Sequence, residues 1–330
     1  MNFQNLNYFC KQCPLSPDEN KTGIKRKILN IITALLTLAV MLYRRIYNLV
    51  VHKNYKYTLG IVAIAKNEGE YIQEWCAFHK AAGVDVIFLY DNESYDDMKE
   101  KLQPFINSGF VKYHYVEGRA KQVPTYNLAL STYKKVCKYI AFIDCDEYLY
   151  SIDHSKELKK TICSFFKDNK NAGGLAINWV MFGDNGHKTT PEGLCIECFT
   201  KRAFYGKQGT KVIKSIVNPR NTLGMENAHS AIYKWGLAAY DLDGYIAPSW
   251  YHTIKEYSTI RLNHYFCKSI EQWHKRRNLG DVAESDPDKI RSLSEFHNHN
   301  NNDIEDISIL FYLSETQKEL NSINNTLKAV

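Results

Sequence analysis

Short apolar runs that alternate with helix-forming segments constrain the fold of this chain most strongly. Four runs are rich in β-branched and aromatic residues and are typical of buried strands: residues 59–65, 84–90, 111–116 and 139–143. Between them lie three segments with apolar residues at helical spacing: residues 71–82, 96–105 and 124–136. This alternation predicts an α/β domain, a single Rossmann-like unit whose mostly parallel mixed sheet carries helices on its faces.

Polar side chains follow three of these strands directly, at the point where each strand ends. The clusters are Lys66-Asn67-Glu68, Asp91-Asn92 and Asp144-Cys145-Asp146-Glu147. Because the carboxyl ends of parallel strands meet at one edge of a sheet, we expect the three clusters to share a ligand site. Asp144 and Asp146 are two residues apart and point the same way. Two such carboxylates suit a divalent cation that also holds phosphate oxygens, whereas an isolated Asp-x-Asp is more often a solvated loop.

Several classes of protein are disfavoured by what the chain lacks. No Gly-x-Gly-x-x-Gly follows the first strand and no Gly-x-x-x-x-Gly-Lys-Ser/Thr occurs, which argues against dinucleotide oxidoreductases and P-loop NTPases. The net charge of +6 includes no long basic block, so nucleic acid is not expected as a partner. Nine scattered cysteines indicate buried thiols in a reducing compartment rather than a disulfide framework.

The termini differ from this central domain. Residues 1–24 are polar and predicted to be flexible, and residues 25–51 form a hydrophobic helix that associates with a membrane. A narrow polar stripe along that helix favours an interfacial position, while a single span and a helix packed on the protein are the alternatives. The central domain is expected over residues 57–280, followed by a polar tail over 281–330 with a short helix near 307–313. A cytoplasmic, bacterial-type location is preferred over a Golgi single-pass protein.

The ordered motifs resemble those of GT-A fold glycosyltransferases, specifically of family 2-like and family 92-like enzymes. The resemblance covers residues 58–280 and is carried by several segments: 61–68, 71–79, 90–96, 122–127, 141–147, 178–187, 214–219 and 263–269. It implies transfer of a hexose from a nucleotide-diphosphate sugar, expected to be a UDP-sugar, to an acceptor hydroxyl on a glycan or glycolipid. Such transfer usually uses Mn²⁺ or Mg²⁺, and the resemblance favours inversion of the anomeric centre.

Mapped onto this sequence, the resemblance and the strand-end clusters give roles to individual residues. The metal ligands would be Asp144, Asp146 and His264, with His229 and His252 as rivals to the histidine. The donor-binding residues would be Lys66, Asn67, Glu68, Asp91, Asn92, Gln122, Asp144 and Lys268. The acceptor side would include Trp179 and His187, because flat aromatic faces suit sugar C–H surfaces.

The sequence does not single out a catalytic base. Asp184 is the first candidate because it follows an aromatic strand on the expected acceptor side, and Glu147 and Glu226 are alternatives. Two other functions remain open at this point. Paired aspartates on a parallel sheet also suit a metal-dependent nucleotidyltransferase, and the same fold could serve as a catalytically silent sugar- or nucleotide-binding module.

Overall fold

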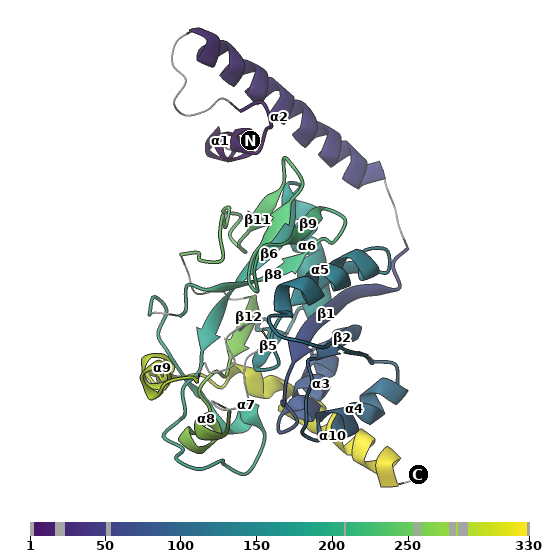
Figure 1. Cartoon of the computed structure of the whole chain (residues 1–330), viewed down its shortest axis with the longest axis vertical. Helices are drawn as coiled ribbons and strands as arrows, with labels where there is room; N and C mark the ends of the chain where they lie inside the picture. Colours follow the sequence, from purple (N-terminus) through teal and green to yellow (C-terminus); the bar gives the residue numbers. More distant parts are fainter. Residues whose placement is uncertain are drawn as a thin grey trace.

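The computed structural model describes residues 3–16, 24–50, 54–207, 209–253, 256, 259–276, 282 and 290–328. Within these residues the chain forms a large mixed sheet with helices on its faces, and two N-terminal helices lie at one end of it (Figure 1). The C-terminal helix lies at the other end of the molecule (Figure 1).

The main sheet has the order β3-β2-β1-β4-β8-β6-β12-β5, and β11 pairs with β6. Its strands are β1 (Tyr57–Ala65), β2 (Val86–Asp91), β3 (Val111–Tyr115), β4 (Cys137–Phe142), β5 (Glu147–Ser151), β6 (Ala172–Met181), β8 (Ile213–Val217), β11 (Ala238–Tyr240) and β12 (Ile260–His264). Strands β3, β2, β1 and β4 are parallel, whereas β8 runs antiparallel to both β4 and β6. The carboxyl ends of β1, β2, β4, β6 and β12 and the amino ends of β5 and β8 therefore lie at one edge.

Two smaller ladders complete the strands. β9 (Thr222–Met225) pairs with β10 (Ala231–Tyr233), and β7 (Lys201–Arg202) pairs with β13 (Ile304–Glu305). The helices of the domain are α3 (Ile72–Ala81), α4 (Met98–Asn107), α5 (Gln122–Tyr133), α6 (Leu158–Asp168), α7 (Cys195–Cys198), α8 (Ile270–Arg276), α9 (Leu293–His299), the 3₁₀ helix η1 (Ser308–Tyr312) and α10 (Leu313–Lys328).

Strand β1 is buried on both faces, which explains its continuous apolar sequence. Alternate residues point to opposite sides: Ile61 and Ala63 belong to the core with α3, α6 and α10, and Val62 and Ile64 belong to the core with α5. Helix α3 ends before Gly83, whose φ of +90° is the left-handed conformation that favours glycine after a helix.

Helix α3 also fixes the segment that follows the acidic turn. The indole Nε1 of Trp75 donates to the carbonyl of Glu147 at 2.8 Å. The Leu149 backbone N–H donates to Nε2 of His79 at 3.1 Å, and Nδ1 of His79 lies 2.9 Å from the Trp75 carbonyl. Because Nε2 accepts a hydrogen bond, Nδ1 must carry the proton and donate it. The fully buried His79 thus joins α3 to β5.

The predicted strands and helices of residues 57–143 are all present, with ends shifted by a few residues. Three segments differ from expectation. Within residues 1–24, which were predicted to be flexible, Phe3–Lys11 form a helix, α1. Glu147–Ser151 forms a strand, β5, because β12 offers it an antiparallel partner. The expected polar tail is instead part of the fold: α10 packs against α3, and β13 pairs with β7. The Lys80–Glu319 ion pair at 2.5 Å joins α3 to α10. The predicted acidic segment near 285–288 lies outside the described residues.

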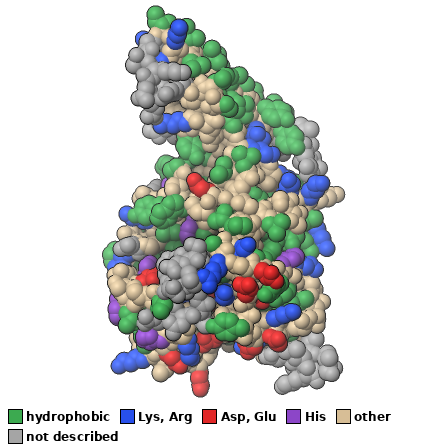
Figure 2. Space-filling model, viewed as in Figure 1, with side chains coloured by type: hydrophobic (Ala, Val, Ile, Leu, Met, Phe, Trp, Pro, Cys, Tyr) green, Lys and Arg blue, Asp and Glu red, His purple; other side chains and the backbone are tan. Residues whose placement is uncertain are grey.

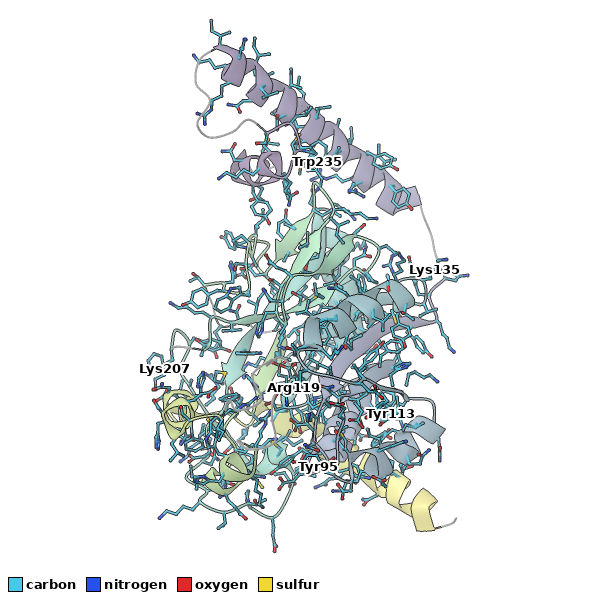
Figure 3. All side chains as sticks on the ribbon, viewed as in Figure 1. Tyr95, Tyr113, Arg119, Lys135, Lys207 and Trp235 are labelled. Carbon is cyan, nitrogen blue, oxygen red and sulfur yellow. The ribbon has the colours of Figure 1, made fainter. Side chains whose placement is uncertain are left out.

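The N-terminal helices α1 (Phe3–Lys11) and α2 (Ile24–Val50) form a hairpin that rests on the loop before β11. Nε1 of Trp235 donates to the Phe9 carbonyl, and Nε of Arg44 donates to the Trp235 carbonyl (Figure 3). Residues Ile24–Tyr47 are the one described segment long and apolar enough to cross a membrane. Figure 2 shows apolar side chains gathered along this helix.

Protonation of His79 should destabilise the protein in acid. Burial lowers the pKa of this imidazole to about 3, against an ordinary value of 6.5. The unfolded chain therefore binds a proton first as the pH falls, and the stability that neutral His79 contributes above pH 6.5 is lost toward pH 3. Between pH 7 and pH 4 the loss should be about 3 kcal/mol.

The measurement is urea unfolding of the wild type and His79→Gln over this pH range. Glutamine does not titrate, so only the wild type should lose the contribution of His79 in acid. The free energy of unfolding of the wild type should therefore fall by about 3 kcal/mol relative to that of the variant between pH 7 and pH 4. A gap that stays constant with pH would contradict the prediction.

Candidate functional site

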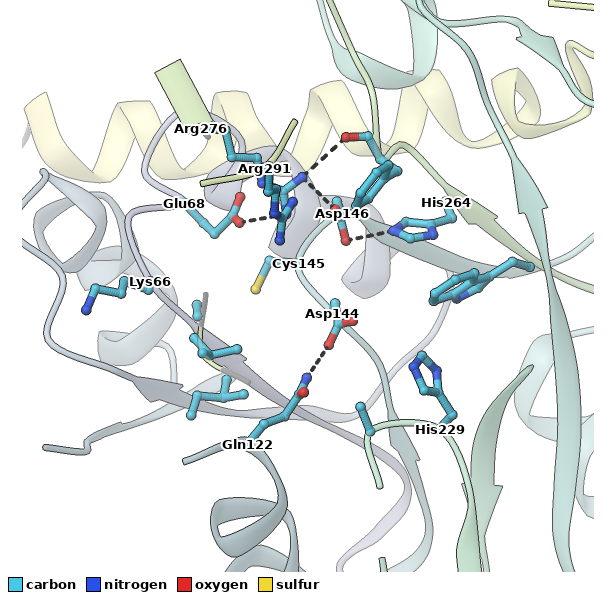
Figure 4. A pocket seen from close by; sticks show the side chains of 16 residues that line it. Lys66, Glu68, Gln122, Asp144, Cys145, Asp146, His229, His264, Arg276 and Arg291 are labelled. Atoms are coloured by element: carbon cyan, nitrogen blue, oxygen red, sulfur yellow. Dashed lines mark hydrogen bonds and ion pairs between the residues drawn. The ribbon is translucent and has the colours of Figure 1, made fainter. Parts of the chain in front are cut away.

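A cavity of ≈ 250 Å³ opens at the edge of the sheet where the carboxyl ends of β1 and β4 meet the amino end of β8 (Figure 4). Its lining includes Lys66, Glu68, Gln122, Asp144, Asp146 and His264, all of which the sequence placed in a donor or metal site, together with Trp179 from the expected acceptor side. The strand-end argument thus brought together residues that are up to about two hundred positions apart in the chain.

Asp144 follows β4 and is the more accessible of the two aspartates, with 31% of its side chain exposed. Lys214 of β8 donates to its Oδ2 at 2.7 Å. On its other oxygen, Oδ1, Asp144 accepts from the amide of Gln122 at 3.1 Å and from the hydroxyl of Tyr126 at 3.2 Å. Asp144 therefore presents a fixed, neutralised carboxylate to the cavity.

Lys214 is buried, with 1% of its side chain exposed. Burial alone would lower the pKa of its ammonium group, but Asp144 and Glu147 raise it above the ordinary value. The ammonium group lies 3.5 Å from Oε1 of Glu147, which also accepts a 2.6 Å hydrogen bond from Nε1 of Trp179. Lys214 is thus a permanent positive charge held between two carboxylates.

Asp146 is fully enclosed and faces the other side of the cavity. Burial opposes its charge, but the Arg276 guanidinium holds the pKa of this carboxyl well below its usual range. Arg276 donates to Oδ2 of Asp146 at 2.8 Å and to Glu68 at 3.3 Å, which joins α8 to the turn after β1 (Figure 4). Nε2 of His264 lies 3.4 Å from the other oxygen, Oδ1.

The imidazole of His264 comes from the last residue of β12, opposite Met181 of β6. Burial lowers its pKa, so it is neutral at pH 7, the form that binds a metal. Its Nδ1 is buried and has no hydrogen-bond partner in the part of the chain that the structure describes. His229 also lines the cavity, whereas His252, the other rival, bonds to Asp241 at 2.9 Å and does not.

The three predicted metal ligands line one cavity, but only Asp146 and His264 are in contact. Among the described residues no three His, Cys, Asp or Glu side chains form a ready metal-binding group. A carboxylate oxygen beside a neutral imidazole suits Mn²⁺, and Mg²⁺ and Mn²⁺ commonly take their remaining ligands from water and substrate phosphates. The pair therefore fits a divalent ion that is completed by the donor.

Other predicted site residues lie outside the cavity lining. Asp91 accepts hydrogen bonds from the Tyr113 hydroxyl and the Ser94 backbone, and the Asn92 amide donates to two backbone carbonyls. Asn67 caps the same turn through the Tyr95 N–H. These polar groups hold the loop after β2 rather than face the cavity.

The remaining candidates are also placed elsewhere. Lys268 packs over the Tyr71 ring at 3.9 Å, and Nε2 of His187 lies 3.1 Å from the Cys198 carbonyl. Asp184 accepts hydrogen bonds within its own turn and from Asn302. Glu226 is exposed and accepts from the Ser230 hydroxyl. Glu147 lines no part of the cavity, and both its oxygens are engaged, since Oε2 accepts from the Asp144 N–H.

Arg276, Arg291 and Phe266 line the cavity but were not predicted as site residues. Arg276 points inward, whereas its neighbour Lys275 forms an exposed i,i+4 pair with Glu271. Helical spacing from the buried Trp273 would have placed Arg276 on the inward face.

A mixed α/β sheet with an Asp-x-Asp turn at its carboxyl edge, facing basic and imidazole groups, agrees with the architecture expected of a GT-A glycosyltransferase. The family model for glycosyltransferase family 92 matches residues 62–307. The chain therefore belongs to glycosyltransferase family 92, as its motifs predicted.

Curated relatives support this assignment. A family 92 protein of Arabidopsis thaliana is 21% identical over 237 residues, which cover 68% of this chain and 40% of the relative. A family 92 protein of Ricinus communis is 24% identical over 156 residues, which cover 47% of this chain and 28% of the relative. The chain thus spans less than half the length of these relatives.

Solved structures are more distant. Staphylococcus aureus TarS 1-349 in complex with UDP-GlcNAc has a TM-score of 0.40 and 14% identity, covering 80% of this chain and 73% of that one. Glucosyl-3-phosphoglycerate synthase from Mycobacterium tuberculosis, in complex with Mg²⁺ and UDP, has a TM-score of 0.24 and 16% identity. The match covers 37% of this chain and 44% of that one. These scores are too low to transfer any property to this chain.

Lys214→Met should destabilise the protein by about 3 kcal/mol, because it leaves two carboxylates without their buried counter-charge. Lys211→Met is the matched control: Lys211 is partly exposed, lies near the Tyr251 ring and pairs with no carboxylate in the cavity, so its loss should cost less than about 1 kcal/mol. Urea unfolding at pH 7 measures both. Equal losses for the two variants would contradict the role assigned to Lys214.

Proposed function

We propose that this chain transfers a sugar from a nucleoside diphosphate sugar to an acceptor hydroxyl at the cavity beside Asp144 and Asp146. Membership of glycosyltransferase family 92 supports the reaction class. The observation that carries the assignment is the charge arrangement of the cavity, where two aspartates from one turn each carry a basic partner, Lys214 or Arg276. A UDP-sugar remains the proposed donor.

The diphosphate of the donor would lie between the aspartate turn and the basic groups of the wall. Lys66 and Arg276 line this wall, and Arg276 keeps 23% of its side chain exposed. An arginine there can leave Glu68 and bind two phosphate oxygens through its planar guanidinium. Lys214 is too deeply buried to move toward the phosphates. It therefore fixes Asp144, while Arg276 binds the leaving group.

The family implies a divalent metal, and Asp146 and His264 would hold it, with Asp144 close by. When bound, Mn²⁺ or Mg²⁺ supplies positive charge to the departing diphosphate. The chain's own residues contribute position: Arg276 neutralises the phosphate charge, and Gln122 and Tyr126 keep Asp144 in place. The Trp179 ring, which lies 4.2 Å from the His264 ring, closes the cavity on the acceptor side.

Inverting transfer needs a carboxylate that deprotonates the acceptor hydroxyl. Among the predicted bases, Glu226 stands in the turn that leads to Ala228 and His229 of the cavity wall. It is exposed and can accept a proton, whereas Glu147 has no free oxygen and Asp184 belongs to another turn. We therefore prefer Glu226 as the base. A glycan or glycolipid remains the proposed acceptor.

The cytoplasmic face remains the proposed location. All nine cysteines are free thiols in the structure. Asn92 lies in an Asn-x-Ser glycosylation pattern, yet it is buried and its amide donates two hydrogen bonds to the backbone. A glycan on Asn92 is incompatible with this fold, which agrees with a protein that does not meet the lumenal glycosylation machinery.

Arg276→Gln should weaken binding of UDP by at least about tenfold, because one charge-assisted phosphate contact is lost. Lys275→Gln is the matched control: it removes one positive charge from the preceding residue of the same helix, which lies outside the cavity. It should change the affinity for UDP by less than about twofold. Isothermal titration with UDP and Mn²⁺ measures both variants against the wild type.

Turnover is followed in parallel as release of UDP from a UDP-sugar. Equal affinities for the two variants would contradict the assigned diphosphate site. Transfer of the nucleotide rather than the sugar to the acceptor, detected by product mass, would replace glycosyl transfer with nucleotidyl transfer.

A further inference from the structure

The outer face of α2 is a continuous apolar surface that no described part of the protein covers. Steps of three, four and seven residues place its members along one side of the helix: Ile28, Ile31, Leu35, Leu42, Tyr43 and Ile46, each 53–62% exposed. From Ile24 to Tyr47 this surface runs for roughly 35 Å. Soluble monomers rarely expose so long an apolar surface.

The opposite face of α2 is already occupied by the protein. Thr33, Thr37 and Met41 are buried there, and Met41 shares a core cluster with Phe9 of α1. Gly236 of the loop before β11 approaches α2 so closely that a Cβ would lie 3.3 Å from Met41. The helix is therefore fixed sideways on the domain.

Polar contacts hold this arrangement. Gln12, just after α1, donates to the Leu237 carbonyl and accepts from the Gly236 N–H. Arg45 donates twice to the Asn171 side chain, at 2.8 and 3.2 Å. The hairpin and the amino ends of β6 and β11 thus form one connected unit.

Two observations identify a lipid surface as the occupant of the apolar face. Residues 24–50 contain no acidic side chain but include Lys25, Arg26 and Lys27 at the amino end, which suits anionic head groups. Tyr43 and Tyr47 are exposed near the second end, where their amphipathic rings suit the head-group region.

A spanning orientation conflicts with the position of α1. This helix packs beside the middle of α2, where Leu15 accepts a hydrogen bond from Thr33. Its Asn7 and Lys11 are exposed, so a spanning α2 would carry them into the hydrocarbon layer. With α2 lying flat, the same residues remain on the aqueous side.

The hairpin and the cavity lie at opposite ends of β6. Ala172 at the start of the strand pairs with Ala238 beside the hairpin, whereas Trp179 near its end lines the cavity. Met181 pairs with His264 of the cavity wall. Seven residues of strand separate Ala172 from Trp179, which is roughly 25 Å. Figure 1 shows α2 beyond the amino end of β6, on the side away from β12.

We propose that the α1–α2 hairpin seats this protein flat on one leaflet of an anionic membrane and holds the cavity away from that surface, at the far end of β6, roughly 25 Å of strand beyond the end that contacts the hairpin. Resting on the proposed sugar transfer, this geometry selects the acceptor class. The reacting hydroxyl must stand well away from the lipid, as it does at the end of an extended glycan chain and not on a single sugar attached to a lipid.

Vesicle binding tests the lipid surface. The full chain should sediment with vesicles of phosphatidylcholine and phosphatidylglycerol, and Leu35→Asp should bind at least tenfold more weakly. Leu128→Asp is the matched control, because Leu128 is 56% exposed on α5, outside the hairpin. Equal binding of the two variants would overturn the proposal. A second result would also overturn it: light scattering that shows dimers of the wild type in lipid-free solution, loss of these dimers in Leu35→Asp, and no binding of the wild type to vesicles.

Protease access tests the orientation. Sealed membranes from expressing cells are treated with protease. If α2 lies flat, an N-terminal epitope and the domain are on the same side of the membrane, so both should be digested or both protected. Protection of only one of them, relieved by detergent, would show a spanning helix and overturn the flat orientation. Neither measurement uses sugar transfer, so the membrane proposal and the proposed function can fail separately.

Acceptor length tests the consequence. On vesicles, glycolipids with an extended oligosaccharide should be used at least tenfold faster than the same lipid with one sugar, and Leu35→Asp should reduce that ratio. Equal rates for both lipids with the bound wild type would overturn the acceptor assignment.

Discussion

Two ion pairs at one edge of the sheet, each with one buried member, make the site possible. Lys214 and Asp146 would each be costly to bury alone, and each has an oppositely charged partner at 2.7–2.8 Å. Lys214 belongs to β8, which lies between β4 and β6 and is antiparallel to both. Arg276 belongs to α8, which comes late in the chain. The acidic turn is therefore stable only when distant segments are in place, which couples the site to the complete fold.

The two pairs differ in a way that suits sugar transfer. Lys214 is enclosed by Asp144, Glu147 and the Trp179 ring, so it acts as a fixed charge. Arg276 is partly exposed and shares its contacts between Asp146 and Glu68. A fixed charge sets the position of the turn, and a movable one can exchange a carboxylate for a phosphate. The proposed transfer would rely on this preorganised charge.

Local pattern was sufficient to predict the strands, the helices of residues 57–143 and the edge at which the site lies. Buried parallel strands have a strong apolar signature, and polar residues must begin where burial ends. Pairing between distant segments has no such signature. Strand β5 and the Lys214–Asp144 pair depend on the register between distant strands, which local pattern does not encode. For the same reason, Asp91, Asn92 and Lys268 matched the expected motifs but were found in supporting contacts. The inward turn of Arg276 could have been inferred from its helical spacing to Trp273.

The central claim is that Asp146 is part of the site that receives the donor's leaving group, where it would hold the metal and pair with Arg276. Mn²⁺-dependent release of UDP from a UDP-sugar tests this claim most directly. The measurement compares the wild type with Asp146→Asn, and with Asp153→Asn as a surface control. Asp146→Asn should lower turnover by at least about 100-fold in protein that is still folded at the assay temperature, because an amide cannot neutralise the metal or Arg276. Turnover within about threefold of the wild type in that variant would contradict the claim.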